Sequence, residues 1–561
     1  MIIVNAELNK KTSQYDYVIV GSGSAGAVVS YRLAAAGHKV LVLEAGGSDW
    51  GPILQMPSAL QVSMSIKRYN WDYSSVPQKN LKNRVLFCPR GKVIGGSSSI
   101  NGMVYVRGHA RDFDSWEVLG AQGWSYKNVL PYFMRMEKSH AGEEGWRGTD
   151  GPMHVTRGTL ENPLYKAFID AGVEAGYNRT QDYNGSCGEG FGAMERTVYN
   201  GRRWSTASAY LRPALETGNV TLIKHALVNK VIISEKTARG VAYSKGGDSF
   251  EVFANKEVIL CAGSINTPKL LELSGVGRAD VLLRNGIDLV HELPGVGENM
   301  QDHPEVIMQW HCKKPITLNK HNNVLSKAFI GAQWLLTKEG LGATNHFEAC
   351  AFIRDRAGIE YPNLEFHFMP AAIQYDGTAI EQKHGFQIMV ASARPLSRGS
   401  THIQSSDPDV SPSIDYNFYD HPDDIVEIRN GIRLAREVIG MPAMNQFAGE
   451  ELLPGAGYET DEQIDQFILE HTGSAYHPCG TCVMGDPANP MTVVDPECRV
   501  VGLMNLRVID SSIIPLVPMG NINAPSIMIG EKGADHVLGI APIAPATRQP
   551  IFVENWQSKQ R

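Results

Sequence analysis

The chain has 561 residues and a formal net charge of −7, with 43% hydrophobic and 20% charged residues. This length and composition indicate a globular protein of several domains, and the acidic balance without a basic stripe argues against nucleic acid as a partner. Eight scattered cysteines and the lack of a long apolar run predict a cytoplasmic protein with reduced thiols, no metal and no transmembrane helix, with peripheral contact at the inner membrane left open.

The N-terminal part carries a dinucleotide-binding pattern. After a polar tail over residues 1–14, an apolar strand at residues 17–20 runs into G-x-G-x-x-G, and residues 27–36 have helical spacing. A second strand over residues 39–43 ends at Glu44. This βαβ order predicts that a pyrophosphate lies at the helix N-terminus and that Glu44 accepts hydrogen bonds from a ribose hydroxyl. The three glycines are Gly21, Gly23 and Gly26.

Alternating elements continue along the chain. Residues 46–89 are rich in glycine and proline, which predicts loops. Later strands are predicted over residues 220–223, 230–233, 257–260 and 506–510, and helices over residues 110–119, 267–273 and 526–538.

The middle of the chain has a different texture, without glycine turns of the nucleotide-site type. Strand-like runs and helical stretches alternate there, at residues 363–369, 387–391, 399–404, 325–337 and 423–438. We therefore predict an α/β protein with a discontinuous Rossmann-like cofactor domain and a second domain in which helices flank an antiparallel sheet. The expected division is a cofactor domain over 15–307 with an excursion near 158–205, a substrate domain over 308–470, a return over 471–540 and a tail over 541–561.

Four segments in order resemble one enzyme family. These are G-K-x-I-G-G-S-S-x-I-N, G-S-x-x-T-P-x-L-L-x-x-S-G-V-G, Y-H-P-x-G-T and G-N-x-N-A, at residues 91–101, 263–277, 476–481 and 520–524. They resemble signatures of the glucose–methanol–choline (GMC) oxidoreductases, and the likeness spans residues 15 to about 540. Four further segments look like those of choline-oxidising members, at residues 68–71, 100–103, 345–349 and 527–532. Periodicity and spacing alone reach only a dinucleotide-binding α/β enzyme.

The resemblance implies FAD as cofactor and oxidation of an alcohol by hydride transfer to the flavin. Some family members bond their flavin through a histidine, and Ile100 stands at that position, so we expect a noncovalent FAD. Val228 resembles the strand residue that holds adenine by its backbone. The expected cofactor-binding residues are Gly21, Ser22, Gly23, Ser24, Ala25, Gly26, Glu44, Ala45, Arg90, Gly91, Val93, Gly96, Ser97, Asn101, Gly102, Met103, Val104, Val228, Ala262, Gly263, Asp510 and Asn523.

By the same resemblance, His477 is the expected catalytic base, because histidine suits proton transfer near neutral pH. The alternative is a buried histidine bonded to the backbone. Asn521 takes the place of the family's second catalytic residue, where its amide would hold the developing alkoxide. As an alternative, Gly520 and Asn521 belong to a sequence that favours turns in any case.

For the substrate, the resemblance points to choline and its oxidation to betaine aldehyde, on the way to glycine betaine. Glu305 and His367 are the expected substrate residues, since a carboxylate and aromatic rings suit a quaternary ammonium. Another primary alcohol, a hydroxy acid, a flavin-containing lyase and a non-catalytic flavoprotein are the alternatives, and a respiratory quinone is the expected electron acceptor. Candidate ring partners are Tyr69, Trp71, Trp310 and Phe347.

Overall fold

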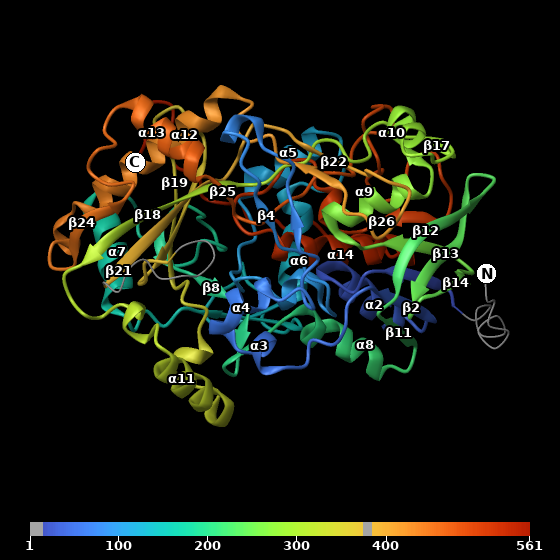
Figure 1. The fold of residues 1–561 in the computed structure, drawn as a ribbon, viewed down its shortest axis with the longest axis horizontal. Helices are drawn as coiled ribbons and strands as arrows, with labels where there is room; N and C mark the ends of the chain where they lie inside the picture. Colours follow the sequence, from blue (N-terminus) through green and yellow to red (C-terminus); the bar gives the residue numbers. More distant parts are fainter. Residues whose placement is uncertain (1–14, 374–383) are drawn as a thin grey trace.

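The computed structural model describes residues 15–373 and 384–561, so the predicted tail over residues 1–14 lies outside the described residues. A parallel sheet and a separate antiparallel sheet occupy the two ends of the elongated molecule (Figure 1). The parallel sheet has the strand order β11-β2-β1-β15-β26. Its strands are β1 (Tyr17–Val20), β2 (Val40–Glu44), β11 (Val220–Lys224), β15 (Glu257–Leu260) and β26 (Leu506–Val508).

The central parallel strands β1 and β2 are buried on both faces because other elements cover both sides. All residues of β1 and β2 are buried, which is typical of a strand between two layers. Helix α2 (Ser24–Ala35) packs against α14 (Asn523–Leu538), and the antiparallel strands β12 (Leu227–Ser234), β13 (Thr237–Lys245) and β14 (Asp248–Phe253) form a separate sheet that contacts β15. Helices α5 (Ala110–Val118), α6 (Tyr126–Met136) and α9 (Gly263–Leu273) complete this half.

The second sheet is antiparallel and has the order β24-β18-β21-β20-β19-β7, with β25 (Gly473–Ser474) paired to β18. One face is apolar and packs on helices α7 (Pro163–Glu174) and α12 (Pro422–Ile439), beside α13 (Asp461–His471). Its strands are β7 (Gly190–Ala193), β18 (Pro304–Cys312), β19 (Ala349–Ile353), β20 (Leu364–Met369), β21 (Gly385–Ser392) and β24 (Ala448–Leu453).

The predicted fold class is confirmed, and the differences are local. The strand expected over 399–404 exists as β22 (Ser400–His402), but it pairs with β23 (Ser413–Asp415) outside the main antiparallel sheet. The loop-rich stretch 46–89 contains two short helices, α3 (Pro52–Gln55) and α4 (Leu60–Ser65). Pro52 stands at the first turn of α3, where its missing N–H costs nothing, so a proline marked a helix start rather than a loop. Strand β18 runs across the domain boundary expected at residue 307.

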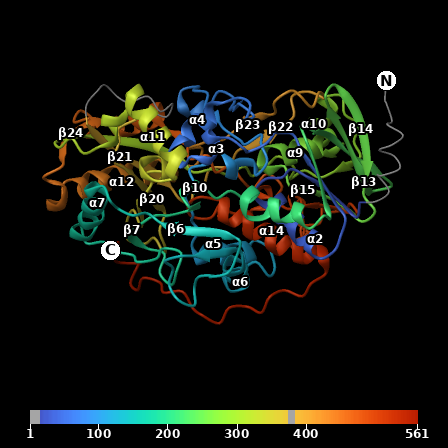
Figure 2. The same cartoon turned by 90° about the horizontal axis from the view of Figure 1, so that it is seen from below.

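Residues beyond α14 form an extended segment that crosses the molecule. Figure 2 shows this segment passing outside α6 and reaching the antiparallel half near β7 and α7. Its end is tied down there, where the Gln560 side chain donates to the carbonyls of Arg354 and Asp355 (2.8 and 3.1 Å) and Arg561 pairs with Glu437 at 2.8 Å. The tail therefore connects the two halves of the fold.

Helix α11 (Val324–Thr337) projects from the body of the molecule. The short helix η6 (Gly340–Ala343), which follows α11, contacts η1 (Pro57–Ala59), which precedes α4. Figure 1 shows α11 standing out below both sheets. Asn323 caps its N-terminus, with Oδ1 accepting from the Ser326 amide at 2.9 Å. Within α11, Trp334 is the buried side chain, and its indole donates to the Gly201 carbonyl at 2.6 Å.

Candidate active site

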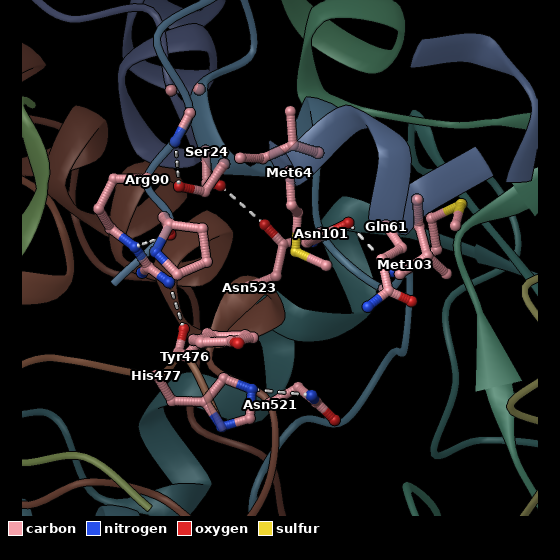
Figure 3. A pocket seen from close by; sticks show the side chains of 18 of the residues that line it. Ser24, Gln61, Met64, Arg90, Asn101, Met103, Tyr476, His477, Asn521 and Asn523 are labelled. Carbon is pink, nitrogen blue, oxygen red and sulfur yellow. Dashed lines mark hydrogen bonds between the residues drawn. The ribbon is translucent and has the colours of Figure 1, made fainter. Parts of the chain in front are cut away.

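One cavity of about 800 Å³ lies between the two halves. On one side it is bounded by the carboxyl ends of the parallel strands and by the N-termini of α2, α9 and α14. The antiparallel sheet and the segment around His477 form the other side (Figure 3). Ligands of open α/β sheets bind outside the carboxyl ends of the strands, so this cavity is the candidate site for cofactor and substrate.

Glycines keep the inner end of the cavity open to a close-fitting ligand. Gly96 has a φ of +54°, and a Cβ there would lie 2.7 Å from the Gly23 Cα. A Cβ on Gly26 would lie 2.2 Å from the Gly21 carbonyl oxygen. A side chain at Gly96 would close the gap between the first βα turn and the 91–104 segment, and one at Gly26 would disrupt the turn itself, so the cradle fits a dinucleotide, whose pyrophosphate needs backbone N–H groups at close range.

Two buried carboxylates end strands of the parallel sheet. Glu44 follows β2 and accepts from the Ser22 amide (3.0 Å), the Ser22 hydroxyl (2.7 Å) and the Gly46 amide (2.7 Å). Asp510 follows β26 and accepts from the Gly263 amide at 2.9 Å, which fixes the start of α9. Burial raises the pKa of both groups. Both carboxylates line the cavity, where Glu44 keeps lone pairs for a ribose hydroxyl.

The 91–104 segment, which the resemblance aligns along the flavin, is held by side chains from distant parts of the chain. Arg203 is 1% exposed and donates to the Asn101 carbonyl at 2.7 Å, while Asn345 donates to the Gly102 carbonyl at 2.8 Å. Met103 has a φ of +59°, a left-handed conformation that is uncommon for a non-glycine residue. Such conformations persist only where neighbours impose them, so the Arg203 and Asn345 bonds define this wall of the cavity.

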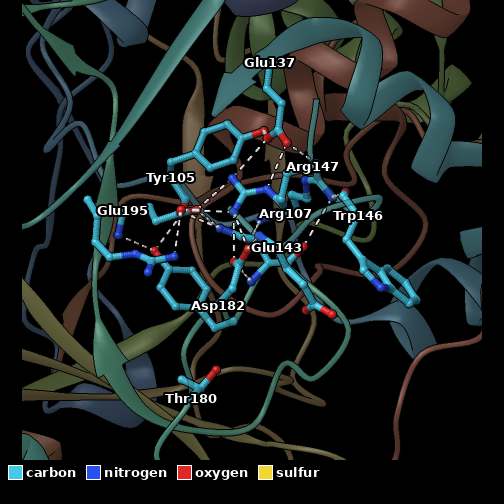
Figure 4. A network of polar contacts seen from close by, with 12 residues as sticks. Tyr105, Arg107, Glu137, Glu143, Trp146, Arg147, Thr180, Asp182 and Glu195 are labelled. Atoms are coloured by element: carbon cyan, nitrogen blue, oxygen red, sulfur yellow. Dashed lines mark hydrogen bonds and ion pairs between the residues drawn. The ribbon is translucent and has the colours of Figure 1, made fainter. Parts of the chain in front are cut away.

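A buried ion network continues this support behind the wall (Figure 4). Arg147 pairs with Glu137 (2.9 Å), Asp182 (2.8 Å) and Glu195 (2.8 Å). Tyr105 lies two residues beyond Met103, and its hydroxyl donates to Glu137 at 2.6 Å. Because every charge in the network has an opposite partner, the network fixes the course of the chain after the cavity wall without leaving an isolated buried ion.

The segment at 476–477 places two side chains of the cavity in direct contact. His477 Nε2 lies 2.9 Å from Asn521 Nδ2, and His477 Nδ1 lies 2.9 Å from His303 Nδ1. The Asp302 carboxylate accepts from the amides of both histidines at 2.8 Å. The structure thus brings together the two predicted catalytic residues, and His303 and Asp302 hold His477 from behind.

These contacts fix the protonation of His477. The Asn521 amide nitrogen can only donate, so His477 Nε2 is the acceptor and the ring proton is on Nδ1, shared toward His303. Burial, together with His303, His367 and Arg90, lowers the pKa of His477 well below its usual value. Burial also lowers the pKa of His303 to about 4. His477 is therefore a neutral imidazole whose Nε2 accepts from Asn521 at the cavity, and a substrate hydroxyl that takes the place of this amide meets an unprotonated nitrogen, as a base requires.

Three ionisable residues of the antiparallel sheet face the cavity region, and we call Glu305, Glu365 and His367 the polar row. Glu305 and Glu365 both pair with Ala391, so they lie abreast on the same face of the sheet. His367 Nε2 lies 3.1 Å from Glu365 Oε1. Burial acts to lower the pKa of His367, but the Glu365 and Glu305 carboxylates outweigh it and raise this pKa to about 9. The row therefore brings two carboxylates and one imidazolium together, and Glu305 and His367 line the cavity.

Most predicted site residues line the cavity, and three lie behind its wall. Ser22 donates to Glu44, Gly26 faces Gly21, and Val93 packs on Leu54 and Ile100. Among the candidate rings, Trp71 and Phe347 line the cavity, whereas Tyr69 and Trp310 do not. Trp310 follows Gln309 on the alternate face of β18 and stacks on Phe386 in the apolar core, because successive side chains of a strand point to opposite faces.

Several residues of the site escaped the sequence analysis. Glu365 had a signal, since in Leu364-Glu365-Phe366-His367-Phe368 the polar residues alternate with apolar ones, as in a strand with one polar face. His303 lies two residues before Glu305, which the sequence had already indicated as a substrate residue. Arg203 had no signal, because its role depends on a contact with Asn101 across 102 positions of the chain.

Comparison with known proteins shows which family has similar sequences. Models of GMC oxidoreductases match residues 15–305 and 395–530. The oxygen-dependent choline dehydrogenase of Brucella suis is 53% identical over 547 residues, which cover 97% of this chain and 100% of that protein. The enzyme of the same name from Rhizobium etli is 54% identical over 538 residues, or 96% of this chain and 98% of that protein.

Solved structures of similar fold are oxidases. Pyridoxine 4-oxidase from Mesorbium loti superposes with a TM-score of 0.85 at 28% identity, covering 94% of this chain and 100% of that chain. A variant of formate oxidase from Aspergillus oryzae, studied for modification of its FAD, gives a TM-score of 0.88 at 26% identity, covering 94% and 98%. The predicted FAD-dependent oxidoreductase class is confirmed, and the chain belongs to the GMC oxidoreductases.

Proposed function

We propose that this protein oxidises choline to betaine aldehyde with a noncovalently bound FAD. The observation that carries the choice of substrate is the polar row, of which Glu305 and His367 line the same cavity as His477. A quaternary ammonium has no N–H to donate, so it is recognised by charge and by aromatic faces. Glu305 supplies the charge, and Trp71, Phe347 and Tyr476 are the aromatic side chains that line the cavity.

The protein's part in the chemistry is proton removal and alignment. A bound FAD would supply the acceptor for the hydride that leaves the alcohol carbon. When the substrate hydroxyl takes the place of the Asn521 amide at His477 Nε2, this neutral nitrogen takes the hydroxyl proton, and the bond from His477 Nδ1 to His303 holds the ring in the required tautomer. The Asn521 amide, 2.9 Å from Nε2, is placed to donate to the alkoxide oxygen that forms at the same point.

For the electron acceptor, we propose a respiratory quinone. The relatives in Brucella and Rhizobium are named oxygen-dependent, which makes molecular oxygen the competing acceptor. Turnover with a soluble quinone and with oxygen under matched conditions decides between them. A rate with oxygen that equals or exceeds the rate with quinone would contradict this part of the proposal.

The substrate assignment is tested by anaerobic bleaching of the bound flavin. Choline should bleach it, while aliphatic primary alcohols and hydroxy acids at the same concentration should bleach it much more slowly. Hydroxy acids should be the poorest, because their carboxylate would meet the Glu305 carboxylate in the cavity. Efficient bleaching by a plain alkanol or a hydroxy acid, with none by choline, would refute the assignment and leave only the family.

A further inference from the structure

Helix α11 exposes its apolar side to solvent, which is the reverse of an ordinary amphipathic helix. The side chains of Val324, Leu325, Phe329, Leu335 and Leu336 are 82%, 83%, 70%, 56% and 86% exposed. With Ala328 and Ala332, which are also exposed, they recur at the spacing of one helical face. We call these seven residues the α11 face. It contains no charged or hydrogen-bonding side chain, although a surface helix normally turns such a face to the core.

The helix is rigidly built, so the exposure does not come from a loosely attached segment. Trp334 is 2% exposed and anchors the opposite side of the helix to Gly201. Lys338 closes the C-terminus by donating from Nζ to the Trp334 and Leu335 carbonyls at 2.9 and 2.6 Å. The chain therefore fixes an apolar ridge in place instead of burying it.

Size and shape decide what the α11 face binds. Fourteen helical residues span about 21 Å, and a single helix presents a strip about 10 Å wide, so the face covers roughly 200 Å². A stable interface with a second protein needs about 800 Å² from each partner. A narrow, convex and wholly apolar strip falls well short of that, but it matches helices that lie in a membrane surface with the apolar side about 5–10 Å deep.

Charge around the helix has the sign that a membrane surface requires. Lys320 and Lys338 flank α11 and Lys327 lies on it, against one acidic residue, Glu339, in the same stretch. The chain as a whole is acidic, with a net charge of −7, so this end differs from the rest of the protein. Clusters of lysine beside an apolar helix face favour anionic lipid headgroups.

The α11 face also lies beside the cavity. Lys327 and Ile330 line the cavity from α11, and Leu60 and Val62 line it from α4. Val62 is itself 50% exposed. Among the described residues, 15–373 and 384–561, no helix is long and apolar enough to cross a membrane. We infer that the α11 face is a membrane-docking surface, which seats the protein on an anionic bilayer with this side of its cavity toward the lipid.

The test uses the flavin-loaded protein and sedimentation with vesicles of phosphatidylcholine and phosphatidylglycerol. The double variant Leu325→Glu/Phe329→Glu places two charges on the α11 face and should lower the fraction bound at least about tenfold. Leu283→Glu is the matched control, since Leu283 is 66% exposed on the distant helix α10 (Ala279–Arg284) and should bind as the unaltered protein does. Vesicles of phosphatidylcholine alone should bind more weakly.

Three results would overturn the inference. The unaltered protein could stay in the supernatant, or the double variant could sediment as well as the control. Light scattering could instead show an oligomer that Leu325→Glu/Phe329→Glu converts to monomers, which would make the α11 face a subunit contact. Flavin content and melting temperature verify folding, and Val324→Glu/Leu336→Glu provides a second pair at the ends of the same face. Turnover of choline with a dye in solution should be unchanged in all these variants, which separates this test from that of the proposed function.

Discussion

The charge of Glu305 should determine the preference for a cationic substrate. Glu305 is 6% exposed, and replacing it with glutamine keeps its size while removing its carboxylate from the cavity lining. A charge pair about 4 Å apart is worth roughly 4 kcal/mol at an effective dielectric constant of about 20, before desolvation is subtracted. We expect between about a third and two thirds of this energy to remain after desolvation, so losing the charge should weaken binding of choline roughly ten- to a hundredfold.

The assay compares choline with dimethylbutanol, its uncharged isostere in which carbon replaces nitrogen. Anaerobic flavin reduction in a stopped-flow instrument gives an apparent dissociation constant for each substrate. Glu305→Gln should weaken choline by the factor above and leave dimethylbutanol nearly unchanged, so that the two constants converge. Because the two substrates have the same shape, the difference between their dissociation constants measures the contribution of the charge.

A matched variant separates charge in the cavity from charge in the fold. Glu348 is also a buried carboxylate, but it pairs with Arg196 at 2.9 Å and does not line the cavity. Glu348→Gln should lower stability while keeping the ratio of the two dissociation constants. Equal losses for both substrates in Glu305→Gln, or a changed ratio in Glu348→Gln, would refute the reasoning from the polar row.

Three further predictions follow from the site. His477→Ala should slow flavin reduction by about 10²–10⁴-fold with flavin still bound, and reduction at the original rate would remove His477 from the mechanism. Acid precipitation should release all the flavin into the supernatant, because Ile100 cannot form a covalent bond to it; yellow protein in the pellet would contradict this. The folded pKa of His367, about 9, exceeds its ordinary 6.5, so its pairing with Glu365 stabilises the fold fully below pH 6.5, and this contribution is lost as pH rises through 9. Urea melts should accordingly show Glu365→Gln less stable near pH 6.5, by at most about 3 kcal/mol because Glu305 contributes part of the pKa shift, and by much less near pH 10, whereas a gap independent of pH would rule out the ion pair.

The sequence predicted those parts of the site that local chain geometry determines. The turn from β1 into α2 and the acids at the ends of β2 and β26 could be placed because an apolar strand followed by a glycine turn or by an acid is a local pattern, although the partners of these acids, Ser22 and Gly263, lie far away along the chain. The Glu365–His367 pair depends on which face of β20 is buried, and that is settled by helices α7 and α12 packing from the other side. Arg203 reaches Asn101 only through the folded chain, so no local pattern could reveal it.

Helix α11 is a second element that the sequence predicted only in part. Its spacing predicted a helix over residues 325–337, and the structure has it at Val324–Thr337. Periodicity gives the helix and its apolar face but not the direction in which that face points. The direction depends on Trp334, whose anchorage to Gly201 places the larger apolar stripe outside.

Segments from both ends of the chain form the cofactor cradle, so the order of synthesis limits when the protein can fold on the ribosome. The first βα turn emerges early, yet the acid after β26, the Asn523 that accepts from the Ser24 hydroxyl at 2.7 Å, and the tail that crosses to Glu437 are synthesised last. Domains usually fold as soon as their residues emerge, N-terminal ones first. Here the cradle stays incomplete until translation is nearly over, so the flavin is loaded late, and a nascent chain stalled before residue 506 should hold none.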